Sequence, residues 1–340
     1  MARLMGIDFG TTNTKAVVFD EYGTALSTST RRTPTRTEGH LRAVYEPEAI
    51  WGAVAATIRE ALDDLPAPKT VDGVAISSMA ESGIPVDQAG RELYPAIAWF
   101  DDRTSPQRDW WRERLGAVRI FSICGLHLDY IFSINKIMWL REHEPEAYGR
   151  MARWLCMSDY LSFRLTGEQA TSPSIASRTM AFDAGERKWS DTMLDAADLS
   201  PDLFPPVKES GSLVGYVTER ASEATGLAVG TPVFVGGHDH LCGALATGVF
   251  RPGAVLDSSG TSEVILVAME DFRPRGEDPE KQGFSCGCHV VPGMYYAFGG
   301  IRSAGSQIEW LRKLFAKELG AEGEDIYTEM ARMGLRAPRG

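Results

Sequence analysis

The sequence predicts an α/β protein with two domains and a mixed sheet. The chain has 340 residues, which is enough for two domains of ordinary size. Residues 4–30 are expected to form three strands in an antiparallel meander, because apolar and β-branched runs alternate with turns rich in glycine and threonine. After this opening, helical patterns alternate with short apolar runs, and this order is typical of an α/β architecture.

The first helix is expected at residues 46–65. Ile50, Val54, Ile58 and Leu62 fall four apart there and therefore share one helix face. The same patterns predict further helices at residues 105–115, 134–143 and 158–165, and buried strands at 71–77 and 96–99.

Glycines close a strand at residues 230–237, and we place the domain boundary there, between residues 1–236 and 237–340. Beyond it, strands expected at 254–258 and 263–268 flank a second glycine–threonine turn. This unit resembles the opening of the chain and is compatible with an internal duplication.

The charge of the chain excludes two classes of partner. Its 35 Lys and Arg residues against 46 Asp and Glu residues give a net charge of −11. Nucleic acids and anionic membranes require a basic surface, so neither is an expected partner. An anionic ligand such as ATP would need a local binding device.

The five cysteines are scattered, which does not indicate a disulfide framework and fits a reducing cytoplasm. Cys286, Cys288 and His289 could suggest a metal site, but their spacing is unusual for zinc and buried strand cysteines are the preferred interpretation. The first residues do not resemble a signal peptide, and no apolar run reaches the roughly 18 residues of a membrane span.

Residues 6–15 place a glycine–threonine turn between two strands. Gly10 lets the backbone approach a phosphate closely, and successive N–H groups in such a turn form an anion-binding nest. The hydroxyl groups of Thr11 and Thr12 add donors, and Lys15 adds a positive charge. This pattern predicts a phosphate-binding loop.

Asp8 ends the strand before this turn, where its carboxylate is expected to hold Mg²⁺, usually through water. Asn13 belongs to the same turn, and Thr14 adds a third hydroxyl group. A plain β-hairpin with polar turn residues is the alternative, and Asp8 is the residue that favours phosphate binding.

A second motif, at residues 236–240, lies between a buried strand and a helical pattern. Asp239 could be a general base that accepts a hydroxyl proton, since a weak base suffices in phosphoryl transfer. It could also be only a helix cap, and His238 and His240 could be surface residues or a metal-ligand pair.

Together these motifs resemble those of the FGGY carbohydrate kinase family, which includes xylulokinases, glycerol kinases, ribulokinases and fuculokinases. An Asp-x-Gly-Thr-Thr stretch alone is shared with actin-like and Hsp70-like ATPases, whereas its combination with Lys-x-x-Trp-Leu and Gly-Gly-x-Asp is specific. The resemblance extends over residues 6–15, 75–87, 99–104, 136–140, 165–168, 236–243, 259–261 and 299–311.

The resemblance implies two ribonuclease-H-like (actin-like ATPase) domains with the active site in the cleft between them. It implies ATP-dependent phosphorylation of a small sugar (a ketose) or polyol, with Mg²⁺ as cofactor. Asp239 matches the general base and Asp8 the Mg²⁺–phosphate site. Gly260 and Thr261 match the second-domain turn that contacts the terminal phosphates of the nucleotide.

Matches at sugar-contact positions imply further roles. Glu81 takes a place held by Glu in glycerol kinases, and Trp99 matches an aromatic residue that packs on the substrate, although core packing is nearly as good an explanation. Asp101 and Arg103 match polar positions of the cleft, with a helix start as the alternative. His240 matches a position that contacts a substrate hydroxyl.

The chain departs from the family pattern in two respects. Glycerol kinases have Arg before the Glu, where this chain has Ala80, and xylulokinases carry Met-His at residues 80–81, so neither specificity is favoured. Family members usually run well beyond residue 340, and the further stretch contacts adenosine. The resemblance therefore implies that the second domain and the adenine pocket are incomplete within these residues.

Two other functions stay open at this point. One is an actin-like or Hsp70-like nucleotide-binding protein without sugar kinase activity. The other is a degenerate kinase that binds sugar without turnover. The expected assembly is a homodimer, the commonest symmetric oligomer.

Overall fold

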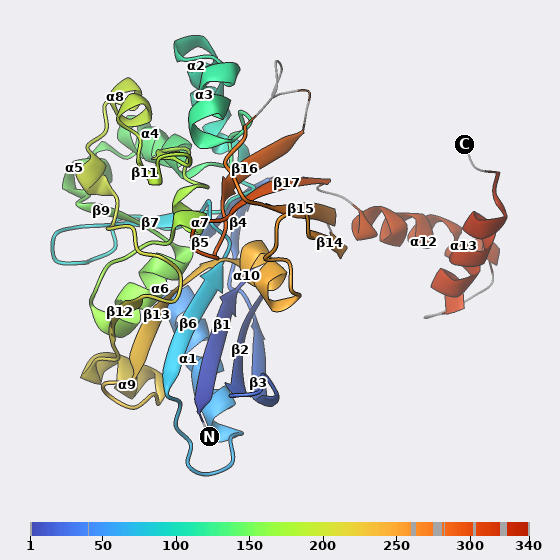
Figure 1. The fold of residues 1–340 in the computed structure, drawn as a ribbon, viewed down its shortest axis with the longest axis horizontal. Coiled ribbons are helices and arrows are strands. Elements are labelled where there is room, and N and C mark those ends of the chain that lie inside the picture. Colours follow the sequence, from blue (N-terminus) through green and yellow to red (C-terminus); the bar gives the residue numbers. More distant parts are fainter. Residues whose placement is uncertain are drawn as a thin grey trace.

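The computed structural model has two main sheets, and many of the helices gather in a group beside the larger one (Figure 1). It describes residues 2–39, 41–259, 263–274, 281, 283–301, 304–319 and 325–338.

The larger sheet has six strands in the order β12-β13-β6-β1-β2-β3. Strands β1, β2 and β3 form the expected antiparallel meander, β6 and β13 run parallel to β1, and β12 is antiparallel to β13. The strands are β1 (Arg3–Phe9), β2 (Asn13–Asp20), β3 (Ala25–Arg32), β6 (Gly73–Ser78), β12 (Leu213–Tyr216) and β13 (Pro232–His238).

The main hydrophobic core lies on one face of this sheet. Met5, Ile7 and Phe9 of β1 are buried in one cluster with residues of α1 and α6. Since side chains alternate along a strand, Asp8 points to the opposite face, at the carboxyl end of β1. The sheet therefore separates the core from the side that carries the predicted phosphate site.

Helices are numerous between β6 and β13 and form a second buried cluster beside the sheet. The predicted helices are present with boundaries that differ by a few residues. The helices are α1 (Pro47–Asp63), α2 (Ser105–Arg114), α3 (Ala117–Cys124), α4 (Ser133–His143), α5 (Pro145–Arg150), α6 (Met157–Thr166), α7 (Pro173–Ala176), α8 (Asp191–Ala197), α9 (Glu219–Thr225), α10 (Asp239–Ala246), and the 3₁₀ turns η1 (Asp102–Thr104) and η2 (Pro201–Leu203).

Three small sheets support these helices and loops. The first joins β4 (Arg36–Gly39), β5 (Arg42–Tyr45) and β8 (Ala96–Ile97), the second joins β7 (Gly83–Val86) and β9 (Arg153–Cys156), and the third joins β10 (Phe182–Asp183) and β11 (Lys188–Trp189).

The second main sheet is antiparallel, in the order β14-β15-β17-β16. Its strands are β14 (Val255–Ser259), β15 (Glu263–Met269), β16 (Phe284–Cys288) and β17 (Tyr295–Ile301). Cys286 and Cys288 are buried in β16, as the preferred interpretation of the sequence predicted.

Strand β16 is fastened to the first part of the chain through its backbone. The amide of Cys286 donates to the carbonyl of Gly125 at 2.6 Å, and the amide of Cys288 donates to Ser177 Oγ at 3.0 Å. Gly125 has φ +71°, and a Cβ there would lie 2.4 Å from the carbonyl oxygen of Cys286. Only glycine permits this close approach.

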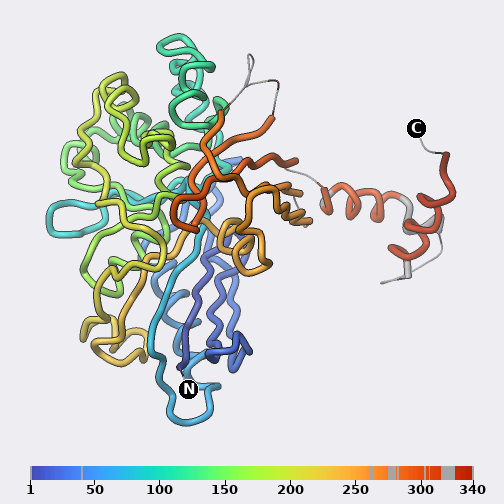
Figure 2. The backbone as a smooth tube through the Cα atoms, viewed as in Figure 1, coloured from blue at the N-terminus to red at the C-terminus, as the bar shows by residue number. Residues whose placement is uncertain are grey.

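Helices α12 (Gly305–Leu319) and α13 (Asp325–Arg336) follow β17 and project away from the rest of the molecule (Figures 1 and 2). Ile308, Trp310 and Leu314 of α12 are at least half exposed. Among the described residues, none of the helices has both the length and the apolar character that a membrane crossing requires.

Candidate active site

The predicted phosphate loop is a tight turn between β1 and β2. The amide of Gly10 donates to the carbonyl of Asn13 at 3.0 Å, and a Cβ on Gly10 would lie only 3.0 Å from that same oxygen. Thr33 fixes the turn from β3 by donating its hydroxyl to the Gly10 carbonyl (2.7 Å) and its amide to the Thr12 carbonyl (2.9 Å). The side chains of Thr12 and Asn13 are left exposed at the tip.

The side chains of the loop have different roles. Thr11 Oγ1 accepts a hydrogen bond from Trp99 Nε1 at 2.8 Å. Lys15 is exposed and lies directly opposite Asp8 in the β1–β2 register. Thr14 differs from the prediction: it is fully buried and its hydroxyl bonds to that of Thr33, because side chains alternate along β2.

Asp8 is partly buried at the end of β1, where Ser77 Oγ donates to its Oδ1 at 2.9 Å. Burial raises the pKa of Asp8; the bond from Ser77 lowers it, and the nearby negative charge of Asp239 raises it further. The two predicted carboxylates are therefore close enough to repel one another, a situation that a divalent cation relieves.

Asp239 lies near Asp8 because β13 pairs with β6, the strand that also pairs with β1. His238 pairs with Ser78, whereas Asp8 pairs with Ser77 on the other side of β6. Gly236 makes this possible, because a Cβ there would lie 1.8 Å from the Ile76 carbonyl oxygen. The ends of three parallel strands thus meet at one edge of the sheet.

Asp239 lies at the start of α10. It is the first residue of α10 rather than the residue before it, and its Oδ1 accepts the neighbouring amide of His240 at 2.7 Å. His238 Nε2 lies 3.3 Å from the same oxygen. Burial lowers the pKa of His238 to about 4, although the charges of Asp239 and Glu81 act in the opposite direction. His238 is therefore neutral near pH 7 and lies beside the Asp239 carboxylate.

A cavity of about 430 Å³ opens beside Asp239. Five of the predicted site residues line it: Thr11, Glu81, Trp99, Asp239 and His240. The other described lining residues, which the sequence did not single out as site residues, are Met79, His127, Asp129, Ile131, Arg178, His238, Val264, Gly283, Phe298, Gly299, Gly300 and Ile301. Both main parts of the chain therefore contribute to the walls.

His127 joins the two parts at the cavity. Its Nδ1 shares a hydrogen bond with Ser285 Oγ of β16 (2.9 Å), and its Nε2 lies 3.9 Å from Asp129 Oδ2. The loop before α4 is thus held against the second sheet.

Asp101 and Arg103 do not line the cavity. Asp101 is fully buried and accepts from the Arg103 side chain and from the Ala43 amide, each at 2.8 Å. Arg103 also pairs with Glu38 at 2.7 Å and lies over the Trp139 ring. In this structure the pair has the alternative role, the start of the helical turn η1. The remaining predicted phosphate residues, Gly260 and Thr261, lie outside the described residues.

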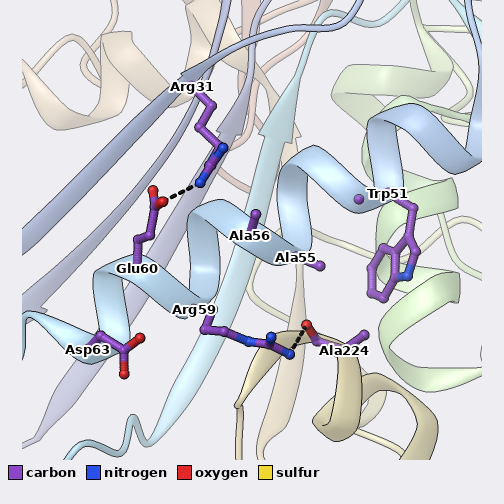
Figure 3. Close-up of a pocket in the computed structure, with 9 residues that line it drawn as sticks. Arg31, Trp51, Ala55, Ala56, Arg59, Glu60, Asp63 and Ala224 are labelled. Carbon is purple, nitrogen blue, oxygen red and sulfur yellow. Dashed lines mark hydrogen bonds and ion pairs between the residues drawn. The ribbon is translucent and has the colours of Figure 1, made fainter.

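A separate hollow of about 390 Å³ lies over α1 and contains none of the predicted site residues (Figure 3). Its charged groups are occupied with neighbours: Arg31 pairs with Glu60, and Arg59 donates to the Ala224 carbonyl. Small side chains, among them Ala55, Ala56 and Ala224, make up much of the rest of its lining.

A known protein family matches most of this chain. The model of the N-terminal domain of the FGGY family of carbohydrate kinases matches residues 3–246. The chain belongs to this family. The match includes α10, so the boundary that we place after residue 236 stays a prediction.

The chain is similar to xylulose kinase from Escherichia coli (31% identical, 91% of this chain and 62% of that protein). It is also similar to autoinducer-2 kinase from Klebsiella pneumoniae (32% identical, 100% and 65%). It therefore spans less than two thirds of the length of these relatives.

Solved structures confirm the fold as that of the FGGY sugar kinases, with its actin-like ATPase architecture. Xylulose kinase from Rhodospirillum rubrum superposes with a TM-score of 0.91 at 27% identity, over 99% of this chain and 68% of that one. The ADP complex of Plasmodium falciparum glycerol kinase has a TM-score of 0.81 at 22% identity, over 92% and 64%, and supports the fold alone.

Proposed function

We propose that the protein phosphorylates a hydroxyl group of a small sugar or polyol, with Mg-ATP as the donor and Asp239 as the general base. The observation that carries this proposal is the position of Asp239. It stands between the carboxylate at the end of the phosphate-loop strand and a cavity large enough for a small polyhydroxy molecule.

The residues present fit the phosphates and the cation. The turn at Gly10 exposes Thr12 and Asn13, and Lys15 stands beside it, which is the donor set that a phosphate needs. Asp8 would hold Mg²⁺ through water, since magnesium prefers one or two carboxylates together with water and phosphate oxygens. The cation would supply positive charge that offsets the Asp8–Asp239 repulsion and the charge of the phosphates.

The chain's own residues would then act on the acceptor. The acceptor oxygen forms a bond to the terminal phosphorus as the bond to ADP breaks, and the hydroxyl proton passes to Asp239. His238 keeps the carboxylate oriented through its 3.3 Å contact. Trp99, held by Thr11, places an apolar ring along one side of the acceptor, and His240 offers a polar group next to the base.

The names of the relatives suggest where to start with acceptors, because relatives about 30% identical are named xylulose kinase and autoinducer-2 kinase. Neither the Arg before Glu81 nor the Met-His pair is present, so the screen should be broader than either. We infer an acceptor of medium length, a ketose or a polyol.

The test is an ATP-coupled screen of ketopentoses, deoxyketoses and four- to six-carbon polyols, with the phosphorylated product identified by mass. Acceptor-dependent ADP release with a sugar phosphate as product is the expected result. ADP release that ignores the acceptor would favour the actin-like or Hsp70-like alternative. Sugar binding without any product would favour the degenerate kinase.

A further inference from the structure

The end of β13, directly before Asp239, is held by a side chain from another element. Strand β13 pairs with β12 only as far as Phe234, whose partner is Leu213. Beyond that point His238 pairs with Ser78 of β6, and its backbone amide donates to Ser174 Oγ of α7 at 3.1 Å. Ser174 thus supplies a hydrogen-bond acceptor to the residue that precedes Asp239.

Ser174 is fully buried, and its hydroxyl is held from a second direction. It shares a hydrogen bond of 2.8 Å with Ser172 Oγ, which also accepts the amide of Ile175 at 3.2 Å and so caps α7. The oxygen that receives the His238 amide therefore has a defined position in the protein.

The backbone of β13 comes unusually close to this hydroxyl. A Cβ on Gly237 would lie 2.8 Å from Ser174 Oγ and 2.5 Å from the side chain of Val290, so only glycine leaves room for the contact. The register of β13 against β6 also shifts between Phe234 and Gly237. Such irregularities are frequent next to active sites, where they change the direction of a side chain. A strand end that leaves the regular ladder needs another anchor, and Ser174 provides one.

We propose that Ser174 is a positioning residue, which holds the end of β13 so that the Asp239 carboxylate faces the acceptor. Ser174 is not among the described residues that line the cavity, so it acts through the backbone of His238 and not on the substrate. The inference rests on the proposed function and adds to it a residue outside the cavity. Proton transfer requires this precision, because a displacement of about 1 Å can cost about 10²-fold in rate.

Ser177, directly after α7, is a matched control. It is also fully buried, and its Oγ accepts a backbone amide, that of Cys288 in β16, at 3.0 Å. Serine to alanine at either position removes one buried hydroxyl that accepts one backbone amide. The two variants differ in the strand that loses its anchor, and only β13 leads directly to Asp239.

Kinetics separate positioning from general support. Ser174→Ala should lower kcat by about 10- to 100-fold, while the Kd of the acceptor, measured by isothermal titration without ATP, should stay nearly unchanged. Single-turnover assays with radiolabelled ATP extend the measurement to slow variants. When Asp239→Asn is already present, Ser174→Ala should have little further effect, because it acts through the missing base. Ser177→Ala should change kcat by the same factor with and without Asp239→Asn.

Hydrogen exchange measures the anchor without any turnover. Peptides that cover residues 236–240 should exchange about five- to tenfold faster in Ser174→Ala, which corresponds to the loss of one hydrogen bond. Peptides from β1 should exchange as in the intact protein, and Ser177→Ala should leave residues 236–240 unchanged.

Three outcomes would overturn the proposal: unchanged exchange at residues 236–240 in Ser174→Ala, an unchanged kcat, or an equal loss of kcat with and without Asp239→Asn. Circular dichroism checks the folding of each variant. Should Ser174→Ala not fold, Ser174→Cys keeps a weaker acceptor, and the same three outcomes apply to it. An intact protein that transfers no phosphate would contradict the proposed function, and the exchange measurement would still decide whether Ser174 holds the end of β13.

Discussion

The two main sheets meet at one cavity but contribute different chemistry. The six-stranded sheet and its loops supply the ionisable groups of the wall, among them Asp239 and Glu81. The second sheet supplies Val264, Phe298 and a run of glycine backbone. The contrast teaches that strand ends and loops of the first part place the candidate reacting groups, while the second sheet provides an apolar cover.

The largest effect on turnover should come from Asp239, the residue directly after β13. Asp239→Asn removes the base without changing its size, and loss of a general base typically costs about 10²- to 10⁴-fold in rate. We expect kcat to fall by this amount while sugar affinity stays nearly the same. Steady-state kinetics and titration with the acceptor provide the check, and unchanged turnover would remove Asp239 as the base.

Matched substitutions in the two sheets compare their packing. Ile76 in β6 is fully buried, whereas Ile265 in β15 is half exposed. Ile76→Ala should cost about 2–5 kcal/mol of unfolding free energy, and Ile265→Ala less than about 1 kcal/mol. Urea denaturation measures both. Equal losses would show that the face carrying Ile265 is covered in solution, for example by a second copy of the chain.

A smaller effect is expected at the end of β1. Asp8→Asn removes one of the two facing carboxylates, and we expect the Mg²⁺ concentration for half-maximal activity to rise about 10- to 100-fold, the range for residues that support a metal. A magnesium titration of the variant gives the answer. An undiminished response to Mg²⁺ would place the cation elsewhere.

The smallest change is expected from the buried ion pair of Glu81 and Arg178, and it concerns the pH dependence of stability. Burial by itself would raise the pKa of Glu81, but Arg178 and His238 outweigh it and lower the pKa to about 2, from an ordinary value of 4.5. The folded protein therefore stays ionised where the unfolded chain takes up a proton. The stabilisation is complete above pH 4.5 and is lost as the pH falls toward 2, by at most about 1.4 kcal/mol per pH unit.

Urea denaturation between pH 7 and pH 3 measures this slope. The double variant Glu81→Gln/Arg178→Gln leaves no unpaired charge, so it should lose the part of the slope that belongs to the pair. A slope identical to that of the intact protein would show that other titrating groups, His238 among them, account for it.

Much of the fold could be predicted because its signals are local. The four-residue spacing from Ile50 to Leu62 gave α1 within a few residues, and the glycine–threonine turn gave the opening meander. Asp8 and Asp239 could be named as candidates for the same reason, since each lies at the end of an apolar strand next to a glycine motif, and their roles stay predictions. Residues 96–99 were expected as a strand, yet β8 spans only Ala96–Ile97.

The rest of the site depends on contacts between distant residues. Arg178 and Glu81 are 97 residues apart in the sequence, and no local sequence pattern predicts their contact. A charged residue near a cleft can bind the ligand, or it can form an ion pair with another residue of the protein. Arg103 bonds to Asp101, two residues before it, and also to Glu38, so its guanidinium is paired within the protein.

The bonds that fasten β16 also limit how the cavity can open. The second sheet could rotate and still keep the amide contacts of Cys286 and Cys288. The rotation axis would then lie along β16, which would act as the hinge. Strand β14 is at the far edge of that sheet and would move furthest. Strand β17, which carries Phe298, is next to β16 and would move little. Access would therefore widen at β14 and β15 while the ring of Phe298 stays over Arg178.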